Sequence, residues 1–176
     1  MYYSTEYQSP LGVFSLAADG ESLVGAWLEE QKYFGASLLA AAVKDDRLPV
    51  FAQTKAWLDR YFAGQRPEIS ELPLAPAGTD FRQAVWQILC RIPYGQLLTY
   101  GEIARMMAVM LNKKTMSSQA VGGAVGHNPI SIIIPCHRVV GAKGNLTGYA
   151  GGIEIKVKLL ELEGVDVSAL TMPKAK

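Results

Sequence analysis

The segment "QRPEISELPLAPAG", residues 65–78, limits the fold most strongly, because it places prolines at positions 67, 73 and 76. Proline lacks the amide donor that a helix or an inner strand needs, and it disfavours the helical conformation of the residue before it. We therefore predict an extended linker here. Because a chain of 176 residues can form two small domains, we divide it into residues 1–75 and residues 76–176.

The part before the linker has the pattern of a small sheet followed by a helix. The runs "YYSTEY", "VFSLAA" and "SLVGAWL" alternate with turn sequences, which predicts an antiparallel meander over residues 1–28. In "LPVFAQTKAWLDRYFAG" the apolar residues recur at helical spacing, and the segment ends at Gly64, a favourable residue after a helix. We expect a small antiparallel-sheet domain.

The part after the linker is mainly helical, so the fold class is α+β. "TDFRQAVWQILCRI" predicts a core helix that Thr79 caps, with Cys90 buried in it and without a function. "LTYGEIARMMAVML" places Glu102 three residues after Thr99, the pattern of a capping box. Together with "MSSQAVGGAVG" it forms a helix-turn-helix candidate, which either binds DNA or is a plain packing hairpin.

Three further elements are expected near the end of the chain. "ISIII", residues 130–134, has the composition of a buried strand, and the turn-rich "VVGAKGNLTGYAGG" predicts a hairpin about Gly144 and Asn145. "GGIEIKVKLLELEG" predicts a last helix that ends at Gly164. The glycines in these segments match neither a phosphate-binding loop nor a dinucleotide fingerprint, so we expect no nucleotide cofactor.

Composition and charge narrow the possible functions. Two cysteines and two histidines are too few for a disulfide framework, and a structural zinc site is not expected from them. Without a secretory pattern at the start or a long apolar run, we expect a cytoplasmic protein with no membrane span. Residues 1–78 carry 6 Lys and Arg against 10 Asp and Glu, whereas residues 79–176 carry 11 against 6. This asymmetry indicates either a polyanion partner for the second part or two solvated faces of opposite sign.

The second helix of the helix-turn-helix candidate is rich in glycine. Glycine at positions 122, 123 and 126 weakens a helix by about 1 kcal/mol each relative to alanine. Glycine therefore indicates that another backbone or a ligand comes very close, or that a neighbouring helix packs tightly there.

The dipeptide of Cys136 and His137 is a candidate catalytic pair. A cysteine attacks as the thiolate, which a neighbouring imidazole can help to form. In an extended segment the two side chains would point to opposite faces, so a direct hydrogen bond does not follow from adjacency. A histidine base also needs an orienting group, and Glu102, Glu154, Glu161 and Glu163 are candidates that spacing does not rank. The alternatives are a buried Cys136 beside a surface His137, or a metal site that would need His127 and a distant acid.

A longer set of motifs decides among these alternatives. "NPISIIIPCHRVVG" resembles the active-site signature of the O6-alkylguanine-DNA alkyltransferases, the methylated-DNA-protein-cysteine methyltransferase family. The resemblance extends over residues 79–164, through "FRQAVWQILCRIPYGQLLTYGEIA" and "QAVGGAVGHNP" upstream and "LTGYAGG" and "KLLELEG" downstream. The first 75 residues match the family's small N-terminal, ribonuclease H-like sheet domain in pattern.

The resemblance implies DNA repair by a suicide methyltransferase that acts once. Cys136 would take a methyl or other alkyl group from O6 of guanine, and also from O4 of thymine, and keep it as a thioether. His137 would be the base, acting through a water, Glu163 would orient it, and Asn128 would help to shape the site. Tyr100 would handle a backbone phosphate and support the departing guanine. No metal or organic cofactor is implied.

The resemblance also implies how DNA binds. Double-stranded DNA that carries O6-alkylguanine would be bound by a monomer through its minor groove, with the damaged base flipped out. The DNA-contacting residues would be Tyr100, Ser118, Gln119, Ala120 and Gly123. The base pocket would be lined by Val139, Tyr149 and Ala150. The chain departs from the family in two places, because Gln119 stands where an arginine is usual and the connection "MMAVMLNKKTM" is longer than expected.

Three rival functions remain from other classes. A lesion-sensing DNA-binding protein would flip alkylated guanine without transferring anything, but the presence of Cys136 speaks against it. A cysteine hydrolase or acyltransferase would use Cys136 and His137 with an oxyanion hole and would turn over repeatedly. A pure regulator is the third rival.

Overall fold

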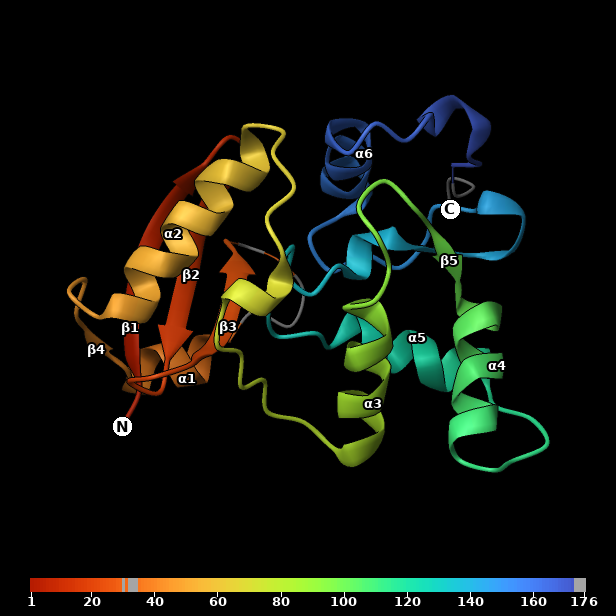
Figure 1. Ribbon diagram of the computed structural model, residues 1–176, viewed down its shortest axis with the longest axis horizontal. Helices are drawn as coiled ribbons and strands as arrows, with labels where there is room; N and C mark the ends of the chain where they lie inside the picture. The colour runs from red at the N-terminus through yellow and green to blue at the C-terminus, as the bar shows by residue number, and fades with distance from the viewer. Residues whose placement is uncertain (30, 32–34, 173–176) are drawn as a thin grey trace. The chain divides into compact units, whose positions relative to one another are not determined.

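The structure is a computed structural model, and it describes residues 1–29, 31 and 35–172 of the chain (Figure 1). The chain divides into two compact units. The first contains residues 1–77 together with Pro129–Ile133, and the second contains Gly78–Asn128 and the chain from Ile134 onward. A sheet unit is thus followed by a mainly helical one, which confirms the predicted α+β class.

The first unit is built on a four-stranded sheet of order β3-β2-β1-β4. The expected meander is present, because β1 pairs antiparallel with β2 and β2 pairs antiparallel with β3. The short β4 adds a parallel edge, with Tyr3 opposite Val43. The bounds of the strands are Tyr3–Ser9 (β1), Gly12–Ala18 (β2), Leu23–Leu28 (β3) and Val43–Lys44 (β4).

Helices cover the sheet of the first unit. The longest, α2 (Pro49–Phe62), begins with proline at its first position, where no amide partner is needed, and contacts β1, β2 and β3 (Figure 1). The short α1 (Ala36–Ala41) packs Leu38 and Leu39 against Trp27 and its neighbours in β2 and β3. Because both faces are covered, every residue of β3 is buried. A 3-10 turn, η1 (Ile69–Glu71), interrupts the extended linker.

In its described residues the second unit contains four α-helices, of which α3, α4 and α5 pack against one another (Figure 1). Thr79 caps α3 as predicted, and Thr99 and Glu102 form the predicted capping box of α4. Two short strands, β5 and β6, pair in parallel. The bounds are Asp80–Leu89 (α3), Leu98–Thr99 (β5), Tyr100–Met110 (α4), Ser118–Gly126 (α5), Cys136–Arg138 (η2), Val139–Val140 (β6), Ala142–Gly144 (η3), Ile153–Leu162 (α6) and Val167–Ala169 (η4).

The prediction of a buried strand at residues 130–134 is wrong, although its isoleucines are core residues as expected. Only Ile130 forms a β-bridge, to Ala26 of the first unit. Ile132 then has a φ of 72°, and the amide of Ile133 donates to the carbonyl of Ser131 at 2.9 Å, a tight γ-turn. A run of isoleucines has no periodicity that separates a strand from a buried turn, because both bury every side chain.

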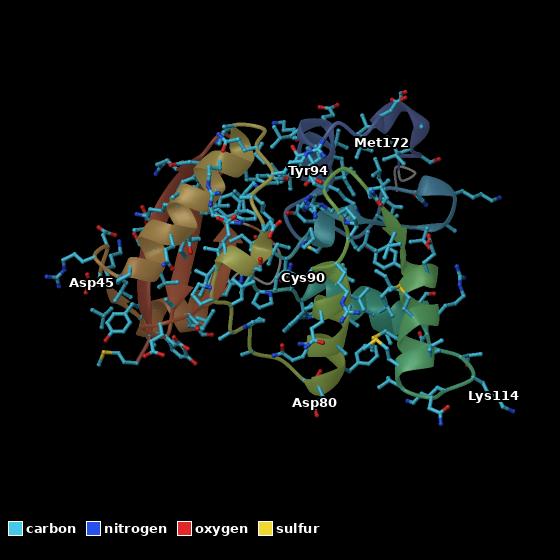
Figure 2. The ribbon with its side chains drawn as sticks, in the orientation of Figure 1. Asp45, Asp80, Cys90, Tyr94, Lys114 and Met172 are labelled. Carbon is cyan, nitrogen blue, oxygen red and sulfur yellow. The ribbon has the colours of Figure 1, made fainter. Side chains whose placement is uncertain are left out.

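The predicted hairpin about Gly144 and Asn145 is also wrong. Residues 142–144 form the 3-10 turn η3, in which Lys143 has a φ of 59°, and Asn145 bridges in parallel to Thr171. The turn chemistry was present, but no second strand follows it in antiparallel order. Cys90 ends α3 as its C-cap, where Figure 2 labels it, and it is half-buried and not fully buried.

No helix in the described part of the chain is long and apolar enough to span a membrane.

Candidate active site

Cys136 and His137 lie in a single turn of 3-10 helix, η2, and not in an extended segment. The turn is preceded by a hydrogen bond from the amide of Cys136 to the carbonyl of Ile134 at 2.8 Å, a γ-turn at Pro135. With three residues per turn, successive side chains diverge by about a third of a circle, so they do not point to opposite faces. The thiol of Cys136 is buried with 6% of the residue exposed, and His137 is fully buried.

The carboxylate of Glu163 is the hub of the site. His137 Nε2 lies 2.5 Å from Oε2, and Arg138 donates from Nε to Oε1 at 2.7 Å and from Nη2 to Oε2 at 3.2 Å. The amide of Gly95 donates to Oε1 at 3.0 Å. Glu163 is the C-cap of α6, and its side chain has no solvent exposure. Both oxygens of this buried carboxylate are therefore satisfied by protein donors.

The charges in this cluster are set by burial and by Arg138. Burial alone would raise the pKa of the Glu163 carboxyl, but the hydrogen bonds from His137 and Arg138 and the charge of Arg138 outweigh it and hold that pKa well below its usual value. Burial lowers the pKa of His137, and Glu163 opposes this only in part. At neutral pH the imidazole is thus neutral, and the guanidinium of Arg138 keeps the carboxylate ionised.

The neutral imidazole has a defined tautomer. Because Glu163 is ionised and can only accept, Nε2 of His137 carries the proton and donates it to the carboxylate. The lone pair is then on Nδ1, which is the ring atom that can accept a proton.

Arg138 makes further contacts besides those with Glu163. Its Nη1 donates to the carbonyl of Ile92 at 2.7 Å, and its guanidinium lies 5.7 Å from the ring centre of Tyr94. Tyr94 in turn donates its hydroxyl to the carbonyl of Leu162 at 3.1 Å, near the end of α6 (Figure 2). The sequence interpretation included Arg138 in the motif but gave it no role.

Gly95 is required by geometry in the same cluster. Its φ is 77°, and a Cβ at this position would lie 2.9 Å from the carbonyl oxygen of Glu163. Only glycine fits both the conformation and the space, so that its amide can reach the carboxylate. The sequence signal was the "PYG" turn after α3, which was interpreted only as a helix end.

Asn128 lies next to Cys136. Its Nδ2 donates to the carbonyl of Ile134 at 2.8 Å, which joins the end of α5 to the turn before Cys136. Burial raises the pKa of the Cys136 thiol, whereas the hydrogen bond with Asn128 and the charge of Lys156 oppose this rise. The resting thiol is thus protonated at neutral pH unless a base removes its proton.

Tyr100 begins α4 and is half-buried. Its hydroxyl donates to the carbonyl of Thr147 at 3.2 Å, and burial together with the charge of Cys136 raises its pKa to about 12. Tyr100 therefore remains a hydrogen-bond donor at neutral pH. Gly148 leaves room for the Tyr100 hydroxyl, because a Cβ at Gly148 would lie 2.9 Å from that oxygen. Its φ of 71° also favours glycine.

The three residues predicted to line the base pocket are not equally close to the surface. Val139 is buried in β6 opposite Leu98 of β5. Tyr149 and Ala150 are half-buried in the turn before α6. Burial and the charge of Cys136 raise the pKa of Tyr149 well above its usual value, so its hydroxyl stays protonated at neutral pH.

A cavity of about 780 Å³ lies beside α4 and α5, the two helices of the helix-turn-helix candidate. It is lined by four of the five predicted DNA-contacting residues, namely Tyr100, Ser118, Gln119 and Gly123. Ala120 is exposed on α5 but is outside the lining, as are the three predicted base-pocket residues and Cys136. Tyr100 lines the cavity, and its pKa responds to the charge of Cys136.

The glycines of α5 do not serve tight helix packing at every position. A Cβ at Gly123 or Gly126 would meet no atom within 4 Å, and one at Gly122 would lie 4.0 Å from the Tyr100 ring. The packing alternative is therefore wrong for Gly123 and Gly126. The opposite side of α5 is anchored, because Trp86 donates from its indole to the carbonyl of Ala124 at 2.9 Å. The structure leaves the glycine face of α5 open.

The family of the chain follows from comparison with known proteins. The family model described as the DNA binding domain of 6-O-methylguanine DNA methyltransferase matches residues 80–165, and the model of its ribonuclease-like domain matches residues 1–76. The chain belongs to this family.

Relatives and solved structures cover nearly the whole chain. A Haemophilus influenzae protein named methylated-DNA-protein-cysteine methyltransferase is 46% identical over 163 residues, which are 93% of this chain and 87% of the relative. A Methanosarcina acetivorans protein of the same name is 40% identical over 93% of this chain and 99% of the relative. The crystal structure of Mycobacterium tuberculosis OGT in complex with DNA has a TM-score of 0.77 and 41% identity, and covers 97% of this chain and 94% of that one.

Proposed function

We propose that this protein repairs DNA by direct reversal, transferring an alkyl group irreversibly from O6 of guanine to its own Cys136. The observation that carries the proposal is the buried cluster in which Cys136 precedes His137, whose ring is held by the ionised Glu163. This is the arrangement of a nucleophile with a base and a group that orients the base. The membership of the chain in a methyltransferase family supports the same chemistry.

The transfer is a displacement at saturated carbon. Nδ1 of His137 accepts the thiol proton of Cys136, through a water, and the thiolate attacks the alkyl carbon. The bond from sulfur to carbon forms as the bond from carbon to O6 breaks, and the guanine anion takes up the proton that the thiol lost. A thioether leaves no route back, so each molecule acts once. The displacement proceeds without a metal or an organic cofactor. The same step would apply to O4 of alkylated thymine.

We assign supporting roles to two residues near the thiol. Asn128 ties the end of α5 to the turn before Cys136 and hydrogen-bonds the nucleophile, so it fixes the position of the sulfur. Tyr100 keeps its proton up to high pH and can donate to the guanine as negative charge develops on it. Asn128 thus acts on the resting site, whereas Tyr100 acts on charge that appears only during the reaction.

The partner in this proposal is duplex DNA that carries O6-alkylguanine, bound through the minor groove by a monomer in the cytoplasm. The target base must leave the stack, at a cost of a few kcal/mol. The open glycine face of α5 lets a sugar-phosphate backbone approach closely, and the cavity beside it holds Tyr100, Ser118 and Gln119. Val139, Tyr149 and Ala150 would line the base pocket. Residues 1–75 and 76–176 act as two domains, with the chemistry and the DNA binding in the second.

The test counts repaired bases per protein molecule. With an excess of duplex DNA containing O6-methylguanine, we expect one guanine restored per molecule and no more. Zero restored with intact binding would favour a lesion sensor without transfer. Many restored would favour a turnover enzyme, and hydrolysis of a simple ester over many cycles would support a cysteine hydrolase.

Replacing Gln119 by arginine is expected to strengthen DNA binding. Gln119 is exposed on α5 and lines the cavity, where a guanidinium can reach phosphates and fill the place of the extruded base. The Gln119→Arg variant should bind duplex DNA several-fold more tightly, and the slope of log affinity against log salt should steepen by about one. Fluorescence anisotropy at several salt concentrations measures both quantities.

The matched control for this prediction is Gln87→Arg, which adds the same charge at an exposed position on α3. An equal change in Gln87→Arg, or no change in Gln119→Arg, would show that Gln119 is not at the point of base extrusion.

A further inference from the structure

Lys156 is a buried charge that the proposed mechanism does not use. It lies on α6 with no solvent exposure, and its Nζ donates to the carbonyls of Val139 at 2.5 Å and Thr147 at 2.9 Å. Within the described part of the chain, the salt bridges do not include Lys156. Two carbonyl dipoles repay only part of the cost of burying an ammonium group. Burial lowers the pKa of Lys156 to about 8, and the charge of Cys136 opposes that fall.

The two carbonyls belong to the segments that enclose the nucleophile. Val139 directly follows the 3-10 helix of Cys136, and Thr147 precedes the turn that carries Tyr149. The carbonyl of Thr147 also accepts the Tyr100 hydroxyl, so Lys156 and Tyr100 share one acceptor. One ammonium group thus fastens both segments and lies in the electrostatic field of the thiol.

We propose that Lys156 is a positioning residue for alkyl transfer, whose ammonium fixes the Val139 and Thr147 segments and favours the thiolate form of Cys136 by its charge. This inference rests on the proposed function of Cys136 as the nucleophile. The charge acts on the attacking group itself, since water screens the attraction between a buried cation and a buried thiolate only weakly. The hydrogen bonds hold the segments in one arrangement, so the charge stays in place.

The groups that face this charge are known for each neighbouring element. Cys136 and His137 face Lys156 from η2, with Arg138 and Glu163 behind the imidazole. Two further titratable groups are coupled to the charge of Cys136, namely Tyr100 at the start of α4 and Tyr149 in the turn before α6. Both tyrosines hold their protons at neutral pH, so the coupled groups that can titrate together with Cys136 between pH 6 and 10 are His137 and Lys156.

The experiment compares single-turnover transfer rates across pH 6 to 10 in wild type, Lys156→Met and Lys156→Arg. We expect Lys156→Met to react about 10-fold more slowly at pH 7 and its rising limb to move up by about one pH unit, since one unit is a tenfold change in thiolate population. Lys156→Arg, which keeps the charge, should restore the position of that limb. The matched control is Lys158→Met, an exposed lysine on the same helix, and it should behave as wild type.

Two outcomes would overturn the inference. If the transfer rate of Lys156→Met rises over the same pH range as that of wild type, Lys156 only supports the structure. If that variant does not fold, the lysine can be titrated by NMR in wild type and in Cys136→Ser. The pKa of Lys156 should be lower without the thiolate, and equal values would reject the coupling. If wild type itself transfers nothing, the proposed function fails and not this inference alone.

Discussion

The Glu163→Gln variant is expected to bind duplex DNA as wild type does and to accept the alkyl group at least about 100-fold more slowly, the lower end of what a positioned base contributes. Glutamine keeps the shape of the side chain but removes the charge that stabilises imidazolium when His137 takes the thiol proton. It can also present an amide donor to His137 Nε2, which would reverse the ring tautomer. A quench-flow measurement of alkylated protein against time gives the rate, and anisotropy gives the affinity.

The matched control for this prediction is Glu161→Gln, which removes an exposed carboxylate two residues earlier on the same helix. It should leave the rate unchanged. An unchanged rate in Glu163→Gln would show that the carboxylate does not assist the proton transfer, whatever its contact with His137.

The Arg138→Met variant is expected to lose about 3 to 5 kcal/mol of unfolding free energy at neutral pH, because it leaves a buried carboxylate without its charged partner. Arg138 donates to both oxygens of Glu163 and to the carbonyl of Ile92, and the variant breaks all three bonds. Urea denaturation followed by circular dichroism measures the loss.

The loss of unfolding free energy in Arg138→Met should depend on pH, and Glu163 determines the direction of this dependence. The folded-state pKa of Glu163 lies below its ordinary value of 4.5, so its ionisation contributes stability that is fully present above that value and is lost as pH falls further. In Arg138→Met the guanidinium no longer holds the Glu163 carboxyl ionised. The difference in unfolding free energy between this variant and wild type should therefore shrink as the pH falls. Arg60→Met is the control, since the Arg60 pair with Glu71 is exposed and should be worth less than about 1 kcal/mol. A similar loss of unfolding free energy in Arg138→Met and Arg60→Met would contradict the view that Arg138 stabilises the buried carboxylate of Glu163.

Local sequence patterns predicted those elements that depend on interactions between residues close together in the sequence. The caps at Thr79 and Thr99, the meander of residues 1–28 and the end of the last helix depend on neighbours within a few positions. The turns around Ile132 and Pro135 were not predicted, because γ-turns leave no periodic trace in an apolar run. Residues 129–133 also belong to the first unit, although they lie inside the predicted second domain, and that pairing depends on Ala26 far away in the chain.

The cluster around Glu163 likewise depends on residues that lie far apart in the sequence. Spacing alone did not rank four glutamates, because His137 and Glu163 are 26 residues apart and meet only through the packing of α6. One signal was available in the sequence. Positions 156, 159, 160 and 163 share a face of α6, so Lys156 and Glu163 interrupt an apolar stripe that otherwise reads as core. Charged residues in such a stripe must find buried partners, which is where a search for site residues could begin.

Intact-protein mass spectrometry tests the central claim most directly. After incubation with duplex DNA containing O6-methylguanine, wild type should gain the mass of one methylene group, about 14 Da, on the nucleophile. Peptide mapping should place it on Cys136. Cys136→Ala should show no gain, whereas Cys90→Ala, which removes the other cysteine, should gain as wild type does. No gain in wild type, or an equal gain in Cys136→Ala, would contradict the account.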